Sequence, residues 1–299
     1  MLSSNPNPSP YIGLVSSIIA SCLFALLPWY VHLYPVTEYS GNEFAAHRII
    51  WSTVLMVFAL SVARQLPLLF YHLKDWRAWP RVMLGSMLVG LQFWLFLWAP
   101  ANGFTLPLAL GYFSLPLVLV LIGRFFYSDS LNTLQWIAVC LAGLGVAYAY
   151  IMTDGLSWIV LVVALGYPLY FVLRRHYPLP SHIAFSLDNF FLLPIALAYL
   201  YFGPSIPANV DFVQPPLIFY IGLGVAGAVP MLLFLLASRR LTMSMFGLMS
   251  YLEPVLVFIV GWALGERLEA NQLPTYLFIV MAVVMLGLDG VRRVRKKTV

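Results

Sequence analysis

Long stretches without a charged side chain constrain this chain more than any other feature. No Asp, Glu, Lys or Arg occurs from Val82 to Gly123, from Ser130 to Thr153, or between Asp211 and Arg239. Each stretch can cross the hydrocarbon core of a bilayer, which takes about 20 apolar residues. Hydrophobic residues make up 62% of the chain and charged residues 9%, more apolar surface than a soluble core can bury. The sequence therefore predicts an all-α integral membrane protein.

Breaking the apolar runs at proline, glycine and charge clusters predicts ten transmembrane helices. Their approximate ranges are 11–33, 43–63, 81–101, 105–124, 131–150, 155–173, 183–202, 215–238, 243–264 and 273–290. The first run has no Lys or Arg ahead of it and no convincing cleavage site, so we expect a retained helix and not a signal peptide. Cys22 and Cys140 fall inside apolar runs, where a thiol behaves as a small hydrophobe and indicates neither a disulfide nor a metal site.

The basic residues give these spans a direction. Fourteen of the 16 Lys and Arg residues fall in alternate connections or in the C-terminal tail, while Arg267 lies in an opposite loop and Arg48 within a span. Cytoplasmic loops carry an excess of Lys and Arg. We therefore expect a bacterial-type cytoplasmic (inner) membrane protein with both termini in the cytoplasm. Because the basic residues form short clusters between apolar runs, they do not indicate a nucleic-acid partner.

A repeat becomes visible when the sequence is compared with itself at an offset of 138 residues. The segment from Leu95 to Gly123 aligns without a gap to the segment from Leu233 to Gly261. The identical pairs are Leu95/Leu233, Phe96/Phe234, Leu97/Leu235, Ala99/Ala237, Leu110/Leu248, Pro116/Pro254 and Gly123/Gly261. Leucine-rich spans can align by chance, but a proline and a glycine shared at one offset favour a true repeat.

The repeat divides the chain into two halves of five predicted spans. We expect a cytoplasmic tail over 1–10, a first repeat over 11–150, a second repeat over 151–290 and a basic cytoplasmic tail over 291–299. An odd number of spans makes the second half enter the membrane from the opposite side, so the repeats are inverted, as in many secondary transporters. In such folds the halves enclose a site near the midplane, and rocking of one half against the other exposes it alternately.

Three segments resemble parts of a known family. NEFAAHRIIWS (Asn42–Ser52), LGYFSLP (Leu110–Pro116) and GYPLYFVLRR (Gly166–Arg175) are similar to segments of RarD-type permeases of the EamA family, in the drug/metabolite transporter superfamily. The likeness covers nearly the whole chain. It implies ten helices in two inverted five-helix repeats, an inner-membrane location and a central cavity lined by the first four helices of each half.

The most specific part of this resemblance is the spacing of Glu43, His47, Arg48 and Trp51. Glu43 and His47 are four residues apart on one helix face, whereas Arg48 points about 100° away around the helix. In a functional role, Arg48 binds a substrate carboxylate and His47 relays protons. In a structural role, Glu43 is an interface residue and Arg48 snorkels outward or locks a helix contact. Both roles remain open from the sequence.

Glu253 is the acidic residue placed deepest in a predicted span. It lies about ten residues into the span 243–264, hence about 15 Å deep in a core of roughly 30 Å. A carboxylate there is unfavourable unless it is protonated, paired or facing water, so Glu253 is a candidate for proton coupling. The alternatives are a neutral acid bonded to a neighbouring helix, or a helix break at Pro254 that brings it closer to solvent. Pro116 and Pro254 each free a backbone carbonyl and are candidate hinges.

Other residues are weaker candidates. Aromatic side chains that could line a cavity, although most aromatics in such a chain serve packing or lipid contact, are Trp29, Trp94, Trp98, Tyr112, Phe113, Tyr167, Tyr170 and Tyr251. Asp188 is expected to pair with Arg174 or Arg175 in a structural role. GLGVAG, residues 222–227, matches a dinucleotide fingerprint, but it lies inside an apolar span, so close helix packing explains it better.

We expect a secondary active transporter, or permease, that moves a small metabolite or drug by alternating access, with efflux as the expected direction. The chain has no GxxxxGK[ST] segment for ATP, and no HExxH or GxSxG motif for a membrane-embedded enzyme. An enzyme and a non-transporting structural or receptor protein remain the alternatives. The expected partners are membrane lipid, a small-molecule substrate and protons, a homodimer is left open, and no cofactor, metal or nucleic acid is expected.

Overall fold

Helices account for nearly all of the residues that the structure, a computed structural model, describes: 10–34, 40–152, 157–177, 179–203, 214–263 and 273–297. These residues contain no β-strand. The helices are α1 (Pro10–His32), α2 (Ser40–Val62), α3 (Leu66–Lys74), α4 (Trp79–Ala101), α5 (Thr105–Phe126), α6 (Thr133–Ile151), α7 (Trp158–His176), α8 (Ser181–Phe202), α9 (Leu217–Arg240), α10 (Met243–Ser250), α11 (Leu252–Ala263) and α12 (Leu273–Lys297).

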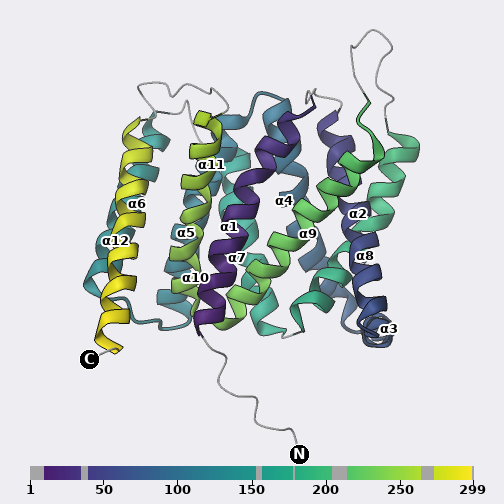
Figure 1. Cartoon of the computed structure of the whole chain (residues 1–299), viewed down its shortest axis with the longest axis horizontal. Coiled ribbons are helices and arrows are strands. Elements are labelled where there is room, and N and C mark those ends of the chain that lie inside the picture. The colour runs from purple at the N-terminus through teal and green to yellow at the C-terminus, as the bar shows by residue number, and fades with distance from the viewer. Residues whose placement is uncertain are drawn as a thin grey trace, which may run out of the picture.

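Eight of the described helices are long and apolar enough to cross a membrane, namely α1, α2 and α4 to α9. Two further apolar helical stretches, Met243–Val257 and Leu273–Leu286, are shorter. Lipid offers the backbone no hydrogen-bond partner, so apolar runs of this length must satisfy their own N–H and C=O groups as helices. The long helices lie side by side between two common ends (Figure 1). The prediction of an all-α membrane protein is confirmed.

The described helices differ from the predicted spans in three places. The short helix α3 lies in the connection after α2 and packs on α8, with Leu69 as its buried residue. The predicted span 243–264 is divided into α10 and α11, which meet at Tyr251. Helix α12 continues to Lys297 and so includes most of the predicted tail. Arg267 lies outside the described residues.

The interruption at Tyr251 follows from the proline three residues later. Pro254 has no N–H to donate to the carbonyl of Ser250, and its ring crowds that carbonyl. The aligned Pro116 lies inside α5, which nevertheless stays continuous from Thr105 to Phe126. The two copies of the repeated segment therefore differ in conformation at matched prolines.

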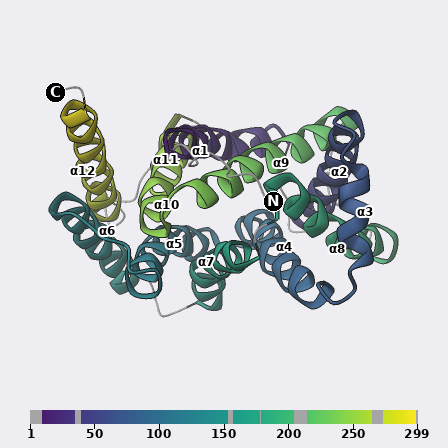
Figure 2. The ribbon, with the colours of Figure 1, turned by 90° about the horizontal axis from the view of Figure 1, so that it is seen from below.

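The helices pack in two rows (Figure 2). One row contains α11, α1, α9 and α2, and the other contains α6, α5, α7 and α4. Between and within the rows, α1 contacts α9 and α11, α2 contacts α8 and α9, α4 contacts α7 and α8, α5 contacts α7 and α10, and α6 contacts α12.

The small residues of α9 let two neighbouring helices approach closely. A side-chain carbon added at Gly224 would lie 2.5 Å from Cβ of Trp51, and one added at Gly227 would lie 2.6 Å from Nε of Arg48. The hydroxyl of Ser52 donates to the carbonyl of Gly224 at 3.0 Å. Close helix packing, the interpretation preferred for GLGVAG, is confirmed.

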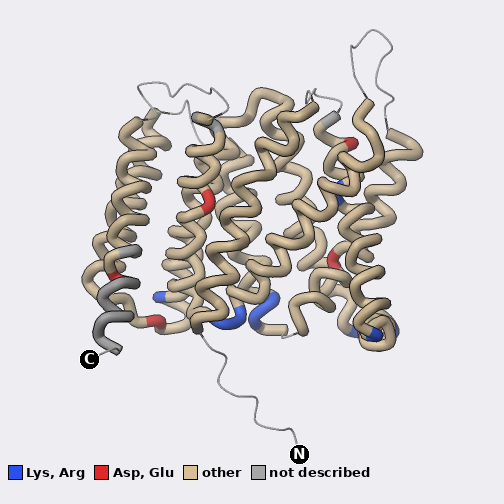
Figure 3. Tube along the Cα trace, in the orientation of Figure 1, with Lys and Arg blue, Asp and Glu red and all other residues tan. Residues whose placement is uncertain are grey.

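Charged residues are distributed unevenly along the bundle. Most Lys and Arg lie at the end where α1 begins and α12 finishes (Figure 3). Arg124 lies in the last turn of α5, Arg174 and Arg175 in the last turn of α7, and Arg239 and Arg240 in the last turn of α9. We call this the basic end. The α4–α5 connection lies at the other end.

Candidate functional site

A cavity of about 370 Å³ lies inside the bundle. Ligand sites for small molecules typically have volumes of this order, about 300–1,000 Å³. Its wall is formed by Phe24, Pro28, Val31, His32, Phe96, Leu97, Pro100, Ala101, Thr105, Leu108, Ala109, Tyr112, Phe113, Leu115, Pro116, Tyr167, Phe171, Phe234, Ser250, Glu253, Pro254, Val257 and Tyr276. Helices from both rows contribute, and the wall is mostly apolar.

The cavity begins at the end of the bundle that lacks the basic clusters. Its wall there includes His32 at the end of α1, Ala101 at the end of α4 and Thr105 at the start of α5. From these residues it extends inward to Phe171 and Phe234, which belong to the second halves of α7 and α9. The cavity therefore approaches one end of the bundle and stops short of the basic end.

Six of the residues singled out in the sequence line this cavity. Glu253 and Pro254 enter it from the start of α11, Tyr112, Phe113 and Pro116 come from α5, and Tyr167 comes from α7. Glu253 is the one Asp or Glu among the described residues that line the cavity. The structure thus gives the acid an interior space in which it can meet water, protons or a solute.

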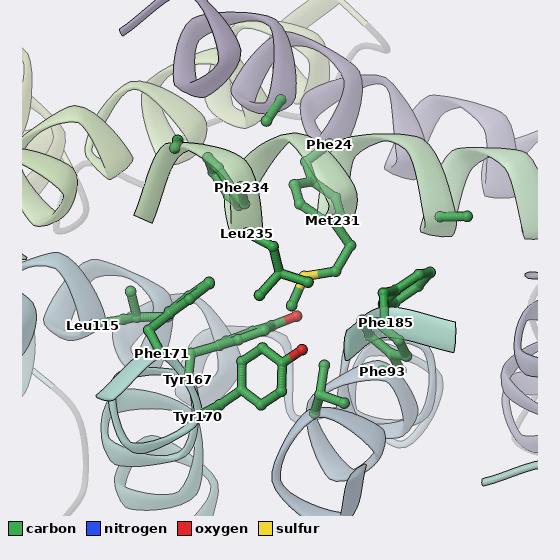
Figure 4. Packing of buried hydrophobic residues seen from close by; sticks show 14 of the residues in the cluster. Phe24, Phe93, Leu115, Tyr167, Tyr170, Phe171, Phe185, Met231, Phe234 and Leu235 are labelled. Carbon is green, nitrogen blue, oxygen red and sulfur yellow. The ribbon is translucent and has the colours of Figure 1, made fainter. Parts of the chain in front are cut away.

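Aromatic rings close the cavity towards the basic end. The rings of Phe171 and Phe246 meet edge to face with their centroids 4.7 Å apart, and Phe246 also meets Phe234 at 5.6 Å. Phe24 of α1 completes the group by packing on Phe234 at 5.4 Å. Figure 4 shows Phe234 and Phe24 facing Phe171 and Tyr167 from the opposite row. We call Phe24, Phe171, Phe234 and Phe246 the aromatic floor.

Polar contacts below the floor join α5 and α7 to the segment around α10. The backbone N–H of Ser244 donates to Oδ2 of Asp129 at 2.8 Å, and its hydroxyl donates to the carbonyl of Val120 at 3.2 Å. Arg175 donates through Nη2 to the carbonyl of Leu241 at 2.6 Å. The basic end is therefore closed by hydrogen bonds as well as by rings.

Arg48 reaches the interior from α2. Its side chain is 2% exposed, and its Cζ lies 4.3 Å from the centroid of the Phe93 ring. The guanidinium lies within electrostatic range of Tyr112, Tyr167 and Glu253, all of which line the cavity. Arg48 is thus next to the cavity wall, and it does not snorkel outward.

Glu43 and His47 form a separate group between α2 and α9. His47 Nε2 lies 3.9 Å from Glu43 Oε1, and the Tyr220 hydroxyl donates to the same oxygen at 2.8 Å. The His47 ring stacks on the Tyr220 ring with centroids 3.9 Å apart. Neither Glu43 nor His47 belongs to the cavity wall. The structure places them beside an interhelical tyrosine.

Tyr170 belongs to a buried ion pair and not to the cavity wall. Its hydroxyl donates to Asp188 Oδ2 at 2.7 Å, and Ser86 donates to Asp188 Oδ1 at 3.1 Å. Arg174 donates to Asp188 Oδ1 and completes the network. The predicted pairing of Asp188 with Arg174 is confirmed. The four residues of this network join α4, α7 and α8.

The remaining candidates also lie outside the cavity wall. Trp94 and Trp98 stack at 4.8 Å, and Trp94 Nε1 donates to Asn42 Oδ1 at 2.6 Å. Tyr251 is fully buried and packs in the same cluster as Phe113. These aromatic rings support helix packing.

Several wall residues were not singled out from the sequence, namely Phe24, Phe96, Phe171, Phe234, Ser250 and Tyr276. The repeat alignment contained a signal for some of them. Phe96 and Phe234 are an identical aligned pair, and both line the cavity. Tyr112 aligns with Ser250, and both line it too. Aligned positions of the repeat therefore converge on one space.

A bundle of apolar helices around a solute-sized cavity, with an acid in its wall, defines a multi-pass membrane protein of the transporter class. No protein-family model matches the chain. Over 95% of its length the chain is 41% identical to the chloramphenicol-sensitive protein RarD of Pseudomonas aeruginosa, of which it covers 96%. It is 31% identical to protein RarD of Salmonella typhimurium over 95% of its own length and 97% of that protein. It is 30% identical to an uncharacterized transporter of Haemophilus influenzae over 96% of its own length and 97% of that protein.

A crystal structure of a protein with 17% sequence identity has the same fold, with a TM-score of 0.68 over 92% of this chain and 97% of that one. The identities over nearly the whole length decide the family. The chain belongs to the RarD family and is a membrane transporter. The resemblance of its sequence to RarD-type permeases is confirmed.

Proposed function

We propose that the chain is a secondary transporter that works by alternating access between two inverted five-helix repeats. In this proposal ten helices span the membrane, with α10 and α11 forming one interrupted span and α3 lying outside the count. The observation that carries the proposal is the convergence of aligned positions on one cavity: Phe96 with Phe234, and Pro116 with Pro254. A site between two repeats is the arrangement that rocking motions expose to each side in turn.

The packing of the helices supports the same division. Exchanging the halves pairs α1 with α7, α2 with α8, α4 with α9, α5 with α10 and α11, and α6 with α12. The α1–α9 contact then corresponds to the α7–α4 contact, and the α2–α9 contact corresponds to the α8–α4 contact. The α5–α7 contact corresponds to the α11–α1 contact. The α2–α8, α5–α10 and α6–α12 contacts map onto themselves. Two repeats related by an axis between them would pack in this way.

The basic end is proposed to face the cytoplasm of a bacterial-type inner membrane, because Lys and Arg are enriched on that side. Both termini then lie in the cytoplasm. The cavity approaches the opposite end, so the described conformation corresponds to an outward-facing state with the aromatic floor closing the cytoplasmic side. Export of a small metabolite or drug is the direction that the resemblance to drug/metabolite permeases implies.

Glu253 is proposed as the proton-coupling group. It is the acidic residue in the wall of the cavity, and a buried carboxyl in a membrane is stable when it is protonated, paired or facing water. Rocking of the repeats would change its access from one side to the other. Such a group can take up a proton on one side and release it on the other.

Flux in proteoliposomes tests the proposal. Liposomes containing the full chain are loaded with radiolabelled chloramphenicol, the compound in the name of the P. aeruginosa relative, and release is followed with and without a pH gradient. Parallel liposomes carry phenylacetate or phenylacetamide. We expect release faster than from protein-free liposomes for at least one solute, and a response to the gradient. Release equal to protein-free liposomes for all three solutes would overturn the transport proposal.

The pH response has its own control. Glu253→Gln keeps the size and hydrogen-bonding capacity of the side chain but cannot ionise. We expect this variant to transport without any response to the pH gradient. An unchanged pH profile would remove Glu253 as the coupling group and leave alternating access standing.

A further inference from the structure

Two arginines are buried in the described part of the chain, Arg174 and Arg48, and they differ in their partners. Arg174 is bonded to Asp188, whose carboxylate also accepts from Tyr170 and Ser86. Arg48 is 2% exposed, its buried Nε has no hydrogen-bond partner among the described residues, and its guanidinium forms no ion pair with any of them. A guanidinium carries five N–H donors, and the stacking of Arg48 on Phe93 satisfies none of them. Arg48 is a buried cation that lacks an anion.

The nearby acids do not supply this anion. Glu43, one turn earlier on α2, is already bonded to Tyr220 and lies next to His47. Glu253 lies within electrostatic range of Arg48, but the two form no ion pair. Arg48 and Glu253 therefore interact only through their charges at longer range, and Nε of Arg48 keeps no hydrogen-bond partner among the described residues.

The path of the Arg48 side chain is set by a glycine on α9. Carbon added at Gly227 would lie 2.6 Å from Nε and 3.0 Å from Cγ of Arg48, so the absence of a side chain there makes room for the guanidinium. Tyr112 and Tyr167, whose ring centroids are 6.3 Å apart, line the cavity within electrostatic range of this guanidinium. The guanidinium also lies 5.9 Å from the ring of Phe96 in the cavity wall, so an acidic group of a solute in the cavity would find beside it a planar cation suited to bidentate recognition.

The positive charge of Arg48 would then lie near two negative charges, that of a bound solute anion and that of ionised Glu253. If a solute anion binds at Arg48 while Glu253 is ionised, the cavity holds a net negative charge in a medium of low dielectric, which is unfavourable. Protonation of Glu253 removes this repulsion. Anion binding and proton binding must therefore favour each other, by reciprocity of linked equilibria.

We propose that an organic anion binds at Arg48 together with a proton on Glu253, so that the anion and the proton cross the membrane in the same direction. The crossing rests on the proposed transport function, whereas the joint binding does not. An exporter with this linkage releases an organic acid down the concentration gradient of that acid. Each anion crosses together with one proton, so no net charge moves across the membrane.

Other ionisable groups near this site must be distinguished from Glu253 as the group that takes up the proton. They are His32 of α1 and Tyr276 of α12 in the cavity wall, Tyr112 of α5, Tyr167 of α7, Tyr251 between α10 and α11, and His47 beside Arg48 on α2. Tyrosines ionise near pH 10 in their ordinary range, so the two histidines are the competitors near neutral pH.

The test uses phenylacetate and phenylacetamide, which share a shape and differ in charge. Binding to the purified full chain is measured by calorimetry in detergent, and proton uptake is recorded with a pH indicator in weak buffer, between about pH 6 and pH 9. We expect phenylacetate to bind about tenfold or more tightly than phenylacetamide, with uptake of up to one proton, and phenylacetamide to take up none. Equal affinities of the two compounds would overturn the proposal.

Four variants locate the two charges. Arg48→Gln should lose the preference for phenylacetate and keep the binding of phenylacetamide, while Arg77→Gln, which removes a charge from an exposed site, should change neither. Glu253→Gln should keep phenylacetate binding and lose proton uptake.

Proton uptake that survives in Glu253→Gln, or that disappears in His47→Gln, would place the proton on another group and overturn the proposal. Equal loss of both compounds in Arg48→Gln would show that Arg48 is structural.

Failure of this inference and failure of transport give different results. A carboxylate preference with proton uptake, but no flux in proteoliposomes, would uphold the joint site and overturn the transport proposal. Flux of chloramphenicol without any carboxylate preference would uphold transport and overturn the joint site.

Discussion

The rings of Phe171 and Phe246 meet edge to face, 4.7 Å between centroids, and this contact joins α7 to α10 across the closed side of the cavity. Phe246 is fully buried, and its second aromatic contact is with Phe234. Removing the ring leaves a void in the aromatic floor, and loss of a buried phenylalanine typically lowers the free energy of unfolding by about 3–5 kcal/mol. The floor is therefore the place to test which contacts keep the basic end closed.

Phe246→Ala should open the cavity towards the basic end. The measurement is labelling of Ser250→Cys, which lies in the cavity wall, by a membrane-impermeant thiol reagent added from the basic side, after the exposed Cys22 and Cys140 are changed to serine. We expect severalfold faster labelling in Phe246→Ala. Phe126→Ala, at a site 82% exposed, is the control and should leave the rate unchanged. Equal labelling rates in both variants would mean that the ring of Phe246 does not close the cavity towards the basic end.

Gly227→Ala should displace Arg48 without removing its charge. The added carbon would lie 2.6 Å from Nε of Arg48, and overpacking of this kind costs about 1–3 kcal/mol. We expect the variant to unfold at lower temperature and to lose the preference for phenylacetate. Gly143→Ala is the matched control, because no atom lies within 4 Å of the added carbon there, and alanine favours a helix over glycine by up to about 1 kcal/mol. A carboxylate preference that survives Gly227→Ala would contradict this placement of Arg48.

Breaking the Arg174–Asp188 pair should destabilise the protein more than replacing it. Asp188→Leu leaves the buried guanidinium of Arg174 without its anion, which typically costs about 3–5 kcal/mol. The double variant Asp188→Leu with Arg174→Met removes both charges and should recover most of that loss. Unfolding of the three proteins in detergent measures the difference. Equal stability of the single and double variants would show that the pair is not a coupled unit.

Pro254→Ala should slow transport without weakening solute binding. The new N–H can donate to the Ser250 carbonyl and favours a continuous helix through Tyr251 by about 3 kcal/mol, so the interrupted form becomes rare. Pro116→Ala should have the smaller effect, because α5 is already continuous around this proline. Flux and calorimetry on the same preparations separate rate from affinity. Equal effects of the two substitutions would remove the hinge role of Pro254.

Hydropathy and charge predicted most of the fold because lipid restricts the backbone so strongly. An apolar run such as Val82–Gly123 has no alternative to helix in a bilayer, and a proline and charge pattern marks where each helix ends. A helix break at Pro254 was one of the alternatives from the sequence, but Pro116 and Pro254 look alike there, and only tertiary packing decides that one of the two helices breaks. The short helix α3 escaped prediction because its nine residues are too few to give a clear period.

The site was predicted only in part. Depth along a span placed Glu253 in the interior, and the same reasoning placed Asp188 near Arg174. Depth and periodicity do not say which neighbour a ring will meet, so Tyr170 was grouped with cavity residues although it donates to Asp188. The isolation of Arg48 is a property of the surrounding helices and has no signature in the segment that carries it.

The interruption at Tyr251 has a consequence for the transport cycle. In a carrier made of two identical inverted halves, the states open to either side would be related by a two-fold rotation and would have equal energy. Here one half contains a broken helix and its counterpart, α5, an unbroken one. If the chain alternates access as proposed, its two states therefore differ in energy, and the empty carrier would favour one side of the membrane. That bias would determine which compartment the empty carrier faces for most of the time.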